Sequence, residues 1–144
     1  MKLGTLNCRG LKFDLKERQL CTDLETYNLD FLAVQETHRS DIGIIRLESL
    51  KQRKYRLFHS GVAVQKGRIN AGVGILVKDN DLECSFTPVN DRICFLNFEK
   101  NTDKYVLICV YAPTLIDSEK NPEKREKFYT TLESILLKYP QKTV

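Results

Sequence analysis

Two polar side chains follow short apolar stretches near the start of the chain, at positions where strands of a sheet would end. Asn7 follows the stretch 3–6, and Glu36 follows the apolar run 31–34 and one further residue, Gln35. If the two stretches are parallel neighbouring strands, both side chains gather at the sheet edge where α/β proteins bind ligands. A carboxylate supported by an amide suits Mg²⁺, which prefers oxygen ligands and keeps several waters. The alternative is that Glu36 is simply solvated and that Asn7 caps a turn.

Two further side chains near these predicted strand ends could act on a phosphate. His38 follows Glu36 closely and could donate to a phosphate oxygen or transfer a proton, or it could be an exposed loop residue. Tyr111 closes the apolar stretch 106–110, and its phenol could donate to a phosphate oxygen, or its ring could anchor the strand end. The other histidine, His59, stands in no serine or cysteine arrangement that suggests a catalytic triad.

The elements that would position these residues begin with a strand–helix–strand unit. A strand is predicted over 3–8, an amphipathic helix after Asp14, and a buried strand over 30–35. Apolar residues three and four positions apart form one face of the helix, and the residues predicted to face inward are Leu20, Leu24 and Tyr27. Such a unit makes the two strands parallel neighbours.

The remainder of the chain predicts one short helix, several antiparallel strands and a last helix. Residues 42–50 are predicted to form the short helix, with three inward residues: Ile42, Ile45 and Leu50. Strands are predicted over 55–58, 72–77, 82–87, 93–98 and 105–111, and residues 65–68 are predicted to form a loop. The last helix begins at Pro122, since proline suits a first helical position, and its predicted stripe is Phe128, Leu132, Ile135, Leu136 and Tyr139. A further strand is predicted to start near Thr143.

The composition is that of one globular α/β domain. Of 144 residues, 42% are hydrophobic and 29% charged, and the net charge of +4 permits a polyanionic partner without requiring one. The five cysteines have no metal-clip spacing, which favours a reducing compartment, nuclear or cytoplasmic, over zinc or disulfides. No apolar stretch suits a signal peptide or a membrane span, so no membrane partner is expected. The sequence does not define an oligomeric state.

Four motifs, in a fixed order along the chain, resemble those of the endonuclease/exonuclease/phosphatase superfamily. They are Leu6-Asn7-Cys8-Arg9-Gly10-Leu11, Leu32-Ala33-Val34-Gln35-Glu36-Thr37-His38, Ala71-Gly72-Val73-Gly74-Ile75-Leu76-Val77 and Val110-Tyr111-Ala112-Pro113. The second and third are most similar to the endonuclease domain of non-LTR retrotransposons and to craniofacial-development-protein-2-like proteins. The resemblance implies an α/β (α+β) fold: the N-terminal half of a four-layered α/β/β/α sandwich with mixed, largely antiparallel sheets.

The resemblance also implies roles for individual residues. Glu36 and Asn7 would form the Mg²⁺ site, with Glu36 as the metal ligand. Asn7 would also be a catalytic residue that orients Glu36 and the phosphate region. Tyr111 would be a second catalytic residue, in contact with the scissile phosphate. His38 and Arg9 would be further contacts to the substrate phosphate, and DNA would be the partner of the full domain.

The later motifs of the family do not occur in these 144 residues. They are Gly-Asp-Phe-Asn, a further catalytic aspartate, and Ser-Asp-His. Residues 1–144 are therefore interpreted as a partial domain without its C-terminal half, an incomplete Mg²⁺-dependent DNA endonuclease (a phosphodiester hydrolase) that is inactive as this fragment. Two alternatives remain: a non-catalytic retroelement-derived remnant with weak or no nucleic-acid binding, and a family phosphatase. Whether the chain is itself an enzyme is left open.

Overall fold

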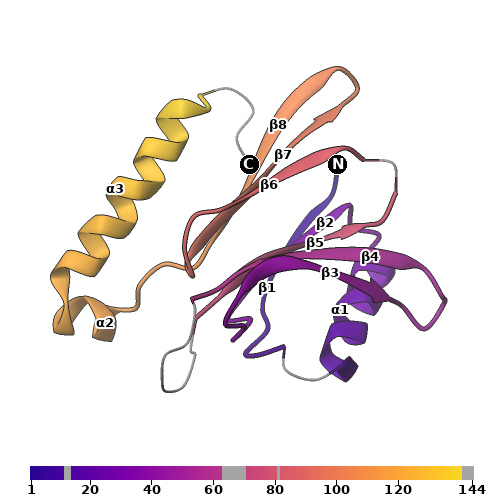
Figure 1. Ribbon diagram of the computed structural model, residues 1–144, viewed down its shortest axis with the longest axis horizontal. Coiled ribbons are helices and arrows are strands. Elements are labelled where there is room, and N and C mark those ends of the chain that lie inside the picture. Colours follow the sequence, from indigo (N-terminus) through magenta and orange to yellow (C-terminus); the bar gives the residue numbers. More distant parts are fainter. Residues whose placement is uncertain (12–13, 63–70, 81, 141–144) are drawn as a thin grey trace.

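Two β-sheets packed face to face form the body of the protein (Figure 1). The computed structural model describes residues 1–11, 14–62, 71–80 and 82–140. The predicted loop over 65–68 and the predicted strand start at Thr143 lie outside these residues. One helix covers the outer face of the first sheet, and two follow the second sheet along the chain.

The first sheet is built from the first half of the chain, in the strand order β1-β2-β5-β4-β3. Its strands are β1 (Leu3–Asn7), β2 (Phe31–Gln35), β3 (Ile42–Glu48), β4 (Lys54–Ser60) and β5 (Val73–Lys78). β1 and β2 are parallel, with Asn7 opposite Gln35, and the other neighbours are antiparallel. Parallel neighbours need a crossover connection, and helix α1 (Asp14–Thr26) supplies it, as the sequence predicted.

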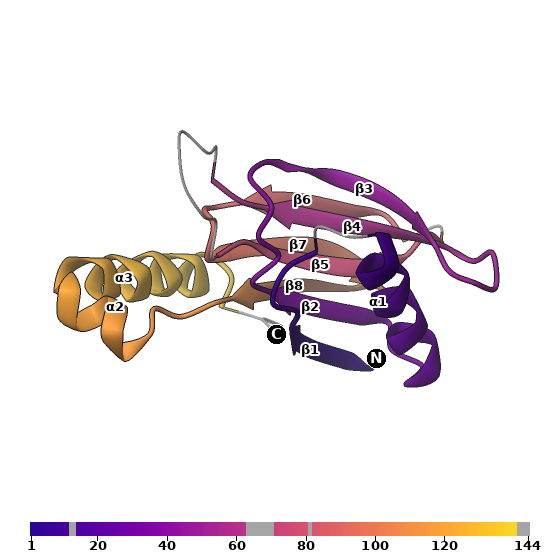
Figure 2. The same cartoon turned by 90° about the horizontal axis from the view of Figure 1, so that it is seen from below.

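Helix α1 covers the outer face of this sheet (Figure 2). Its buried residues Leu20, Cys21 and Leu24 pack on side chains from β2, β4 and β5: Leu32, Val34, Tyr55, Leu57 and Leu76. The prediction that Tyr27 faces inward is wrong, because 68% of its surface is exposed. The helix ends at Thr26, and Asn28 turns the chain with a positive φ of 49°, so Tyr27 leaves the helical face.

The second sheet has three antiparallel strands in the order β6-β7-β8. They are β6 (Cys84–Pro88), β7 (Ile93–Lys100) and β8 (Asp103–Val110), and all three were predicted. Between β7 and β8 stands a two-residue turn in which Asn101 and Thr102 both have positive φ, 53° and 67°. Turns of this hand match the right-handed twist of the strands they join.

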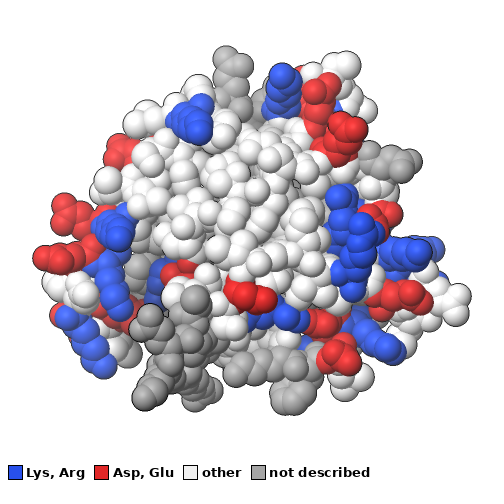
Figure 3. All heavy atoms as spheres, viewed as in Figure 1, with Lys and Arg blue, Asp and Glu red and all other residues white. Residues whose placement is uncertain are grey.

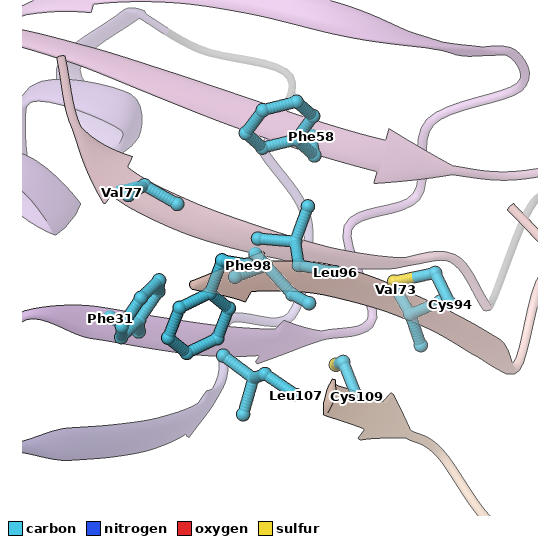
Figure 4. Close-up of a cluster of buried hydrophobic side chains, with 10 residues drawn as sticks. Phe31, Phe58, Val73, Val77, Cys94, Leu96, Phe98, Leu107 and Cys109 are labelled. Carbon is cyan, nitrogen blue, oxygen red and sulfur yellow. The ribbon is translucent and has the colours of Figure 1, made fainter. Parts of the chain in front are cut away.

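The main core lies between the two sheets, where side chains from both inner faces interdigitate (Figure 4). The first sheet contributes Phe31, Phe58, Val73, Ile75 and Val77, and the second contributes Cys94, Leu96, Phe98, Leu107 and Cys109. The rings of Phe31 and Phe98 stand 4.6 Å apart across the layers. The other residues of β7 face the opposite way, which is why the run 93–96 is buried throughout.

Two helices follow the second sheet. Helix α2 (Leu115–Lys120) was not predicted, and it is capped by Thr114 and Asp117, each side chain bonding the other's backbone N–H. Helix α3 (Pro122–Lys138) begins at Pro122 as predicted. Its buried residues, Phe128 and Ile135, pack against the outer face of β7 and β8, at Ile93, Phe95 and Val106. Leu132 and Tyr139 are partly buried there, but the predicted stripe is wrong at Leu136, which is 43% exposed.

Residues 42–50 do not form the predicted helix. Most of the stretch is β3, which pairs with β4 from Ile42 opposite Ser60 to Glu48 opposite Lys54. Burial alternates along it, so Ile42 is 57% exposed whereas Ile45 is half-buried. Leu50 follows the strand and is 75% exposed. Spacings of three and five fit a helix face loosely, but β-branched isoleucines pack better on a pleated surface beside a partner strand.

The order of layers is therefore helix, sheet, sheet, helix, and the predicted α/β class with mixed and antiparallel sheets is confirmed. The edge strands β1 and β8 lie on one side of the molecule, and β3 and β6 lie on the opposite side (Figure 2). On the face shown in Figure 3, acidic and basic side chains are intermixed around the rim of an uncharged central area. In the described part of the chain, no helix has the length and apolarity that crossing a membrane requires.

Candidate active site

The parallel pairing of β1 and β2 brings Asn7 beside Glu36. Asn7 stands opposite Gln35 in the register, and Glu36 is the next residue. Asn7 Nδ2 donates a hydrogen bond of 2.7 Å to Glu36 Oε1. Asn7 Oδ1 accepts one of 3.2 Å from the backbone N–H of Arg9, and this contact fixes which way the amide faces. The carboxylate is therefore oriented by its neighbour on the adjacent strand.

Tyr111 reaches the same carboxylate from the second sheet. Its phenol donates a hydrogen bond of 2.8 Å to Glu36 Oε1, so this oxygen accepts from both Tyr111 and Asn7. The other oxygen, Glu36 Oε2, is 3.8 Å from His38 Nε2. The structure thus brings together three of the predicted site residues by hydrogen bonds and places His38 beside them. We call Asn7, Glu36, His38 and Tyr111 the Glu36 cluster.

Hydrogen bonds in the Glu36 cluster stabilise the charged form of the Glu36 carboxyl group. The bond from Asn7, followed by the bond from Tyr111, holds the pKa of Glu36 below its ordinary value, although partial burial opposes the shift. The nearby charge of Arg9, and that of His38 when its ring is protonated, act in the same direction as the hydrogen bonds. Burial raises the pKa of Tyr111, and its bond to Glu36 raises it further. At neutral pH the pair is therefore a carboxylate and a phenol that donates to it.

The backbone of the segment that carries Glu36 is held on both sides beyond the strand ends. On one side, Gly10 and Leu11 donate to the carbonyls of Glu36 and Thr37 at 2.6 and 2.9 Å. On the other side, the N–H of Thr37 donates to the carbonyl of Gly72 at 3.1 Å. This pairing continues the three-strand contact of β1, β2 and β5 past the regular sheet, so the carboxylate stands on a fixed support.

Several residues of this support have the left-handed backbone conformation. Glu36 and His38 both have φ of 54°, and Arg9 has φ of 49°. Non-glycine residues rarely adopt this region, and such residues gather at functional sites where the surrounding structure holds them. Gly72, with φ of 104°, has no room for a side chain, because an added Cβ would stand 2.2 Å from Thr37 Oγ1. The glycine-rich stretch before β5 therefore allows the segment of Glu36 to pack closely.

Solved structures provide the comparison with known proteins. The endonuclease domain of TRAS1, a telomere-specific non-LTR retrotransposon, is similar with a TM-score of 0.59 and 16% sequence identity, over 96% of this chain and 54% of that one. The AP endonuclease LMAP from Leishmania major has a TM-score of 0.46 and 13% identity, over 77% of this chain and 39% of that one. No protein-family model and no curated protein match the sequence.

The chain has the endonuclease/exonuclease/phosphatase fold. The match to the TRAS1 domain covers 96% of the chain, so it includes nearly all of the layers described above. The chain spans about half the length of that domain, 54%. The fold that the four sequence motifs predicted is therefore confirmed, whereas the roles of the individual site residues stay predictions.

Within the endonuclease/exonuclease/phosphatase fold, Arg92 is a site residue that the sequence reasoning missed. Its Nη1 donates to the carbonyls of Tyr111 and Ala112 at 3.3 Å each, and its Nη2 is 3.4 Å from Asp117 Oδ2. Its Cζ lies 5.0 Å from the centre of the Tyr111 ring. These partners stand 19, 20 and 25 residues further along the chain, so no local pattern reveals them. Arg92 holds the segment from which Tyr111 reaches Glu36.

The basic residues near the motifs have different surroundings in this fold. Arg39 pairs with the buried carboxylate of Glu17 on α1, so it joins the helix to the site segment instead of facing a ligand. Arg56 pairs with Asp79 at 3.2 Å on the far end of the first sheet. Arg9 is exposed, and its charge reaches Glu36. Of these three, Arg9 alone is exposed and has a charge that acts on Glu36.

Proposed function

We propose that the chain is part of a Mg²⁺-dependent DNA endonuclease domain of the retrotransposon type. In this proposal, residues 1–144 are a partial domain that supplies one side of the active site. The observation that carries the proposal is the convergence of Asn7 and Tyr111 on one oxygen of Glu36, at 2.7 and 2.8 Å. The three residues come from three motifs of one family, and they meet on a fold of the same kind. DNA and Mg²⁺ are the partner and cofactor that the proposal requires.

The donor set fits a Mg²⁺ ion that is only partly held by protein. Among the residues that the structure describes, no three His, Cys, Asp or Glu side chains gather where they could hold a metal ion. Glu36 presents one carboxylate, and its Oε2 accepts neither of the bonds from Asn7 and Tyr111. Mg²⁺ is commonly bound through one or two carboxylates, several waters and substrate phosphates. A bound ion would polarise a phosphoryl oxygen and stabilise charge on the leaving group.

Each residue of the cluster has a role that its contacts support. Asn7 orients Glu36 and stabilises its charged form, since its hydrogen bond is the main cause of the lowered pKa. The single O–H of Tyr111 donates to Glu36 in the free chain, and it would turn to a phosphate oxygen when a substrate binds. Arg9 adds positive charge near Glu36, and His38 stands 3.8 Å from Glu36 Oε2. Together these groups would bind and orient a phosphodiester beside the carboxylate.

The same proposal holds that this chain alone does not hydrolyse DNA. The family's aspartate–asparagine motif, which helps position the attacking water, is absent from the sequence, as is its closing aspartate–histidine pair. Loss of a single transition-state donor commonly costs on the order of 10²–10³ in rate. The loss of several leaves binding and orientation without the chemical step.

Plasmid nicking in the presence of Mg²⁺ tests this function. The chain alone should nick no faster than its Glu36→Ala variant, because both lack the groups that activate water. Co-expression with the C-terminal half of the TRAS1 endonuclease domain should restore nicking that the Glu36→Ala variant does not support. Glu36-dependent nicking by the chain alone would show that the active site is complete.

A second candidate is a non-catalytic remnant that binds nucleic acid weakly, since the later motifs of the family do not occur in these 144 residues. The two candidate functions predict different results for plasmid nicking after co-expression with the C-terminal half. If the complementing half assembles with the chain on size-exclusion chromatography but no Glu36-dependent nicking appears, the remnant is the better description.

A further inference from the structure

A pocket that none of the four residues of the Glu36 cluster lines lies where the turn before β7, the segment after β8 and the first half of α3 meet. Its volume is 260 Å³. Three cationic residues line it, Arg92, Lys124 and Lys127, together with the apolar Pro113 and Phe128. One acidic residue, Asp91, is also part of the lining. We call this cavity the α3 pocket.

One of the two lysines is placed where α3 itself does not favour it. Lys124 is the third residue of the helix, and the helix dipole disfavours a cation in the first turn. Lys127 follows three positions later and therefore stands on the same side of the helix. Neither lysine takes part in the ion pairs found among the described residues. Asp117 responds to the charge of Lys124, but its ion pair is with Arg92.

Arg92 connects the α3 pocket with the Glu36 cluster. Its guanidinium is fixed by the carbonyls of Tyr111 and Ala112 and by Asp117, so its charge stays in place without a ligand. It also lies 5.0 Å from the Tyr111 ring, whose phenol contacts Glu36. An anion in the pocket and a phosphate at Tyr111 would thus stand on either side of one fixed cation.

The chemistry of the lining favours a phosphate group. Lys124 and Lys127 supply mobile N–H donors, and Arg92 supplies a fixed cation that Asp117 partly neutralises. With Asp91 as the single acidic residue of the lining, positive charge remains in excess. Phosphate contacts of this kind position a nucleic acid on a protein without selecting its sequence. We propose that the α3 pocket binds a backbone phosphate of the nucleic-acid strand whose neighbouring part lies on the Glu36 cluster. The choice of a nucleic acid rests on the proposed function, and the binding of phosphate does not.

Two glutamine substitutions test the pocket against a matched control. Lys124→Gln with Lys127→Gln removes two charges from exposed positions of α3, and Lys51→Gln with Lys54→Gln removes two exposed charges at the β3–β4 turn. Orthophosphate titrated into the ¹⁵N-labelled chain should shift the amide signals of Arg92 and Lys124 saturably. The shifts should persist in the control variant and in Glu36→Ala, and they should vanish in the α3 variant. No saturable shift at the pocket, or equal shifts in the α3 variant, would overturn the proposal.

A salt titration decides whether the phosphate comes from a nucleic acid. Binding of a fluorescent duplex DNA, measured without Mg²⁺ at increasing salt, should show a slope of log K against log salt that is smaller by about 0.9 in the α3 variant, as expected for one lost phosphate contact. The control variant should keep the slope of the unaltered chain. An equal slope in all three proteins, or no DNA binding at all, would overturn the nucleic-acid assignment, even if orthophosphate still binds. Nicking by the complemented domain is a separate readout, so the proposed function can fail independently of this pocket.

Discussion

The hydrogen bond from Asn7 to Glu36 is the contact on which the candidate site depends most. Because it is the main cause that lowers the pKa of Glu36, we expect Asn7→Ala to raise this pKa toward its ordinary value of 4.5. Tyr111→Phe should raise it by less, since its bond ranks behind that of Asn7. Carboxyl-carbon NMR titration of the chain and both variants measures the order directly. A larger shift for Tyr111→Phe than for Asn7→Ala would contradict it.

The same residue geometry predicts weak binding of Mg²⁺. One protein carboxylate leaves the ion mostly hydrated, and such an ion is poorly held without a substrate phosphate. Calorimetric titration of the chain and of Glu36→Ala should therefore show little difference at millimolar Mg²⁺. Tight binding that disappears in the variant would mean that further ligands complete the site.

His59 makes the stability of the first sheet depend on pH. It is 2% exposed, and burial lowers its pKa below 6.5. As pH falls, the unfolded chain takes up the proton first, so the free energy of unfolding should decrease from about pH 6.5 downward until the folded pKa is reached. Urea unfolding at several pH values measures this decrease. His59→Gln should remove most of this pH dependence, and an unchanged pH dependence in that variant would contradict the prediction.

At the scale of elements, the turn between β7 and β8 contains a residue poorly suited to its conformation. Thr102 has φ of 67°, a region that costs a β-branched residue energy and a glycine almost none. We expect Thr102→Gly to raise the free energy of unfolding by about 0.5–1 kcal/mol, after the entropy that glycine adds to the unfolded chain is subtracted. Thermal melts of this variant and of Thr102→Ala, which keeps a Cβ, test the cause. An equal increase in the free energy of unfolding for both variants would show that the positive φ of Thr102 is not the cause.

The sequence predicts an element correctly where the spacing of its apolar residues and the residues at its ends indicate the same structure. The strand–helix–strand unit is an example, because a helical stripe with Leu20 and Leu24 separates two short apolar runs. Residues 42–50 are predicted as a helix because their scattered isoleucines fit the helical period as well as the strand period. Only the hydrogen-bonded pairing with β4 decides for the strand. Helix α2 could not be predicted because it has no buried residue and therefore no apolar stripe.

The site residues also divide into those that a local sequence motif indicates and those that depend on contacts with distant parts of the chain. Asn7, Glu36 and Tyr111 each follow an apolar run, and motif resemblance pointed to them before their hydrogen bonds were known. Arg92 could not be found in this way, since its partners are backbone carbonyls and a carboxylate on a later segment. The pairing of Arg39 with Glu17 likewise depends on how α1 lies over the site segment.

At the scale of the whole molecule, the edges of β1 and β8 pair with no further strand among the described residues, and they predict self-association. A groove of 270 Å³ lies between them, and Leu3 and Leu6 on β1 are 37% and 38% exposed. Unpaired strand edges with apolar neighbours template pairing with other chains, and a charged residue on the edge suppresses it. Size-exclusion chromatography should show concentration-dependent oligomers. Leu6→Lys should reduce them, whereas Leu15→Lys, on the exposed side of α1, should not.

The same open groove makes marginal stability the expected state of the isolated chain. Each large apolar side chain left uncovered forfeits roughly 1.5–3 kcal/mol, against a whole-domain stability of only ~5–15 kcal/mol. Addition of a complementing half should therefore raise the melting temperature. A monomer with a sharp melt well above about 50 °C, within the usual range of ~45–65 °C, would contradict this expectation.

Each of the two sheets is made from its own continuous stretch of chain. The first ends with β5 at Lys78, and the second begins with β6 at Cys84, so no strand of one is interleaved in sequence with strands of the other. During synthesis on the ribosome, the first sheet and α1 can therefore assemble before the second sheet has emerged. Asn7 and Glu36 would then already be in place on the folded first sheet. Tyr111 is synthesised after both of them, and it would complete the hydrogen-bonded cluster when the second sheet packs on the first.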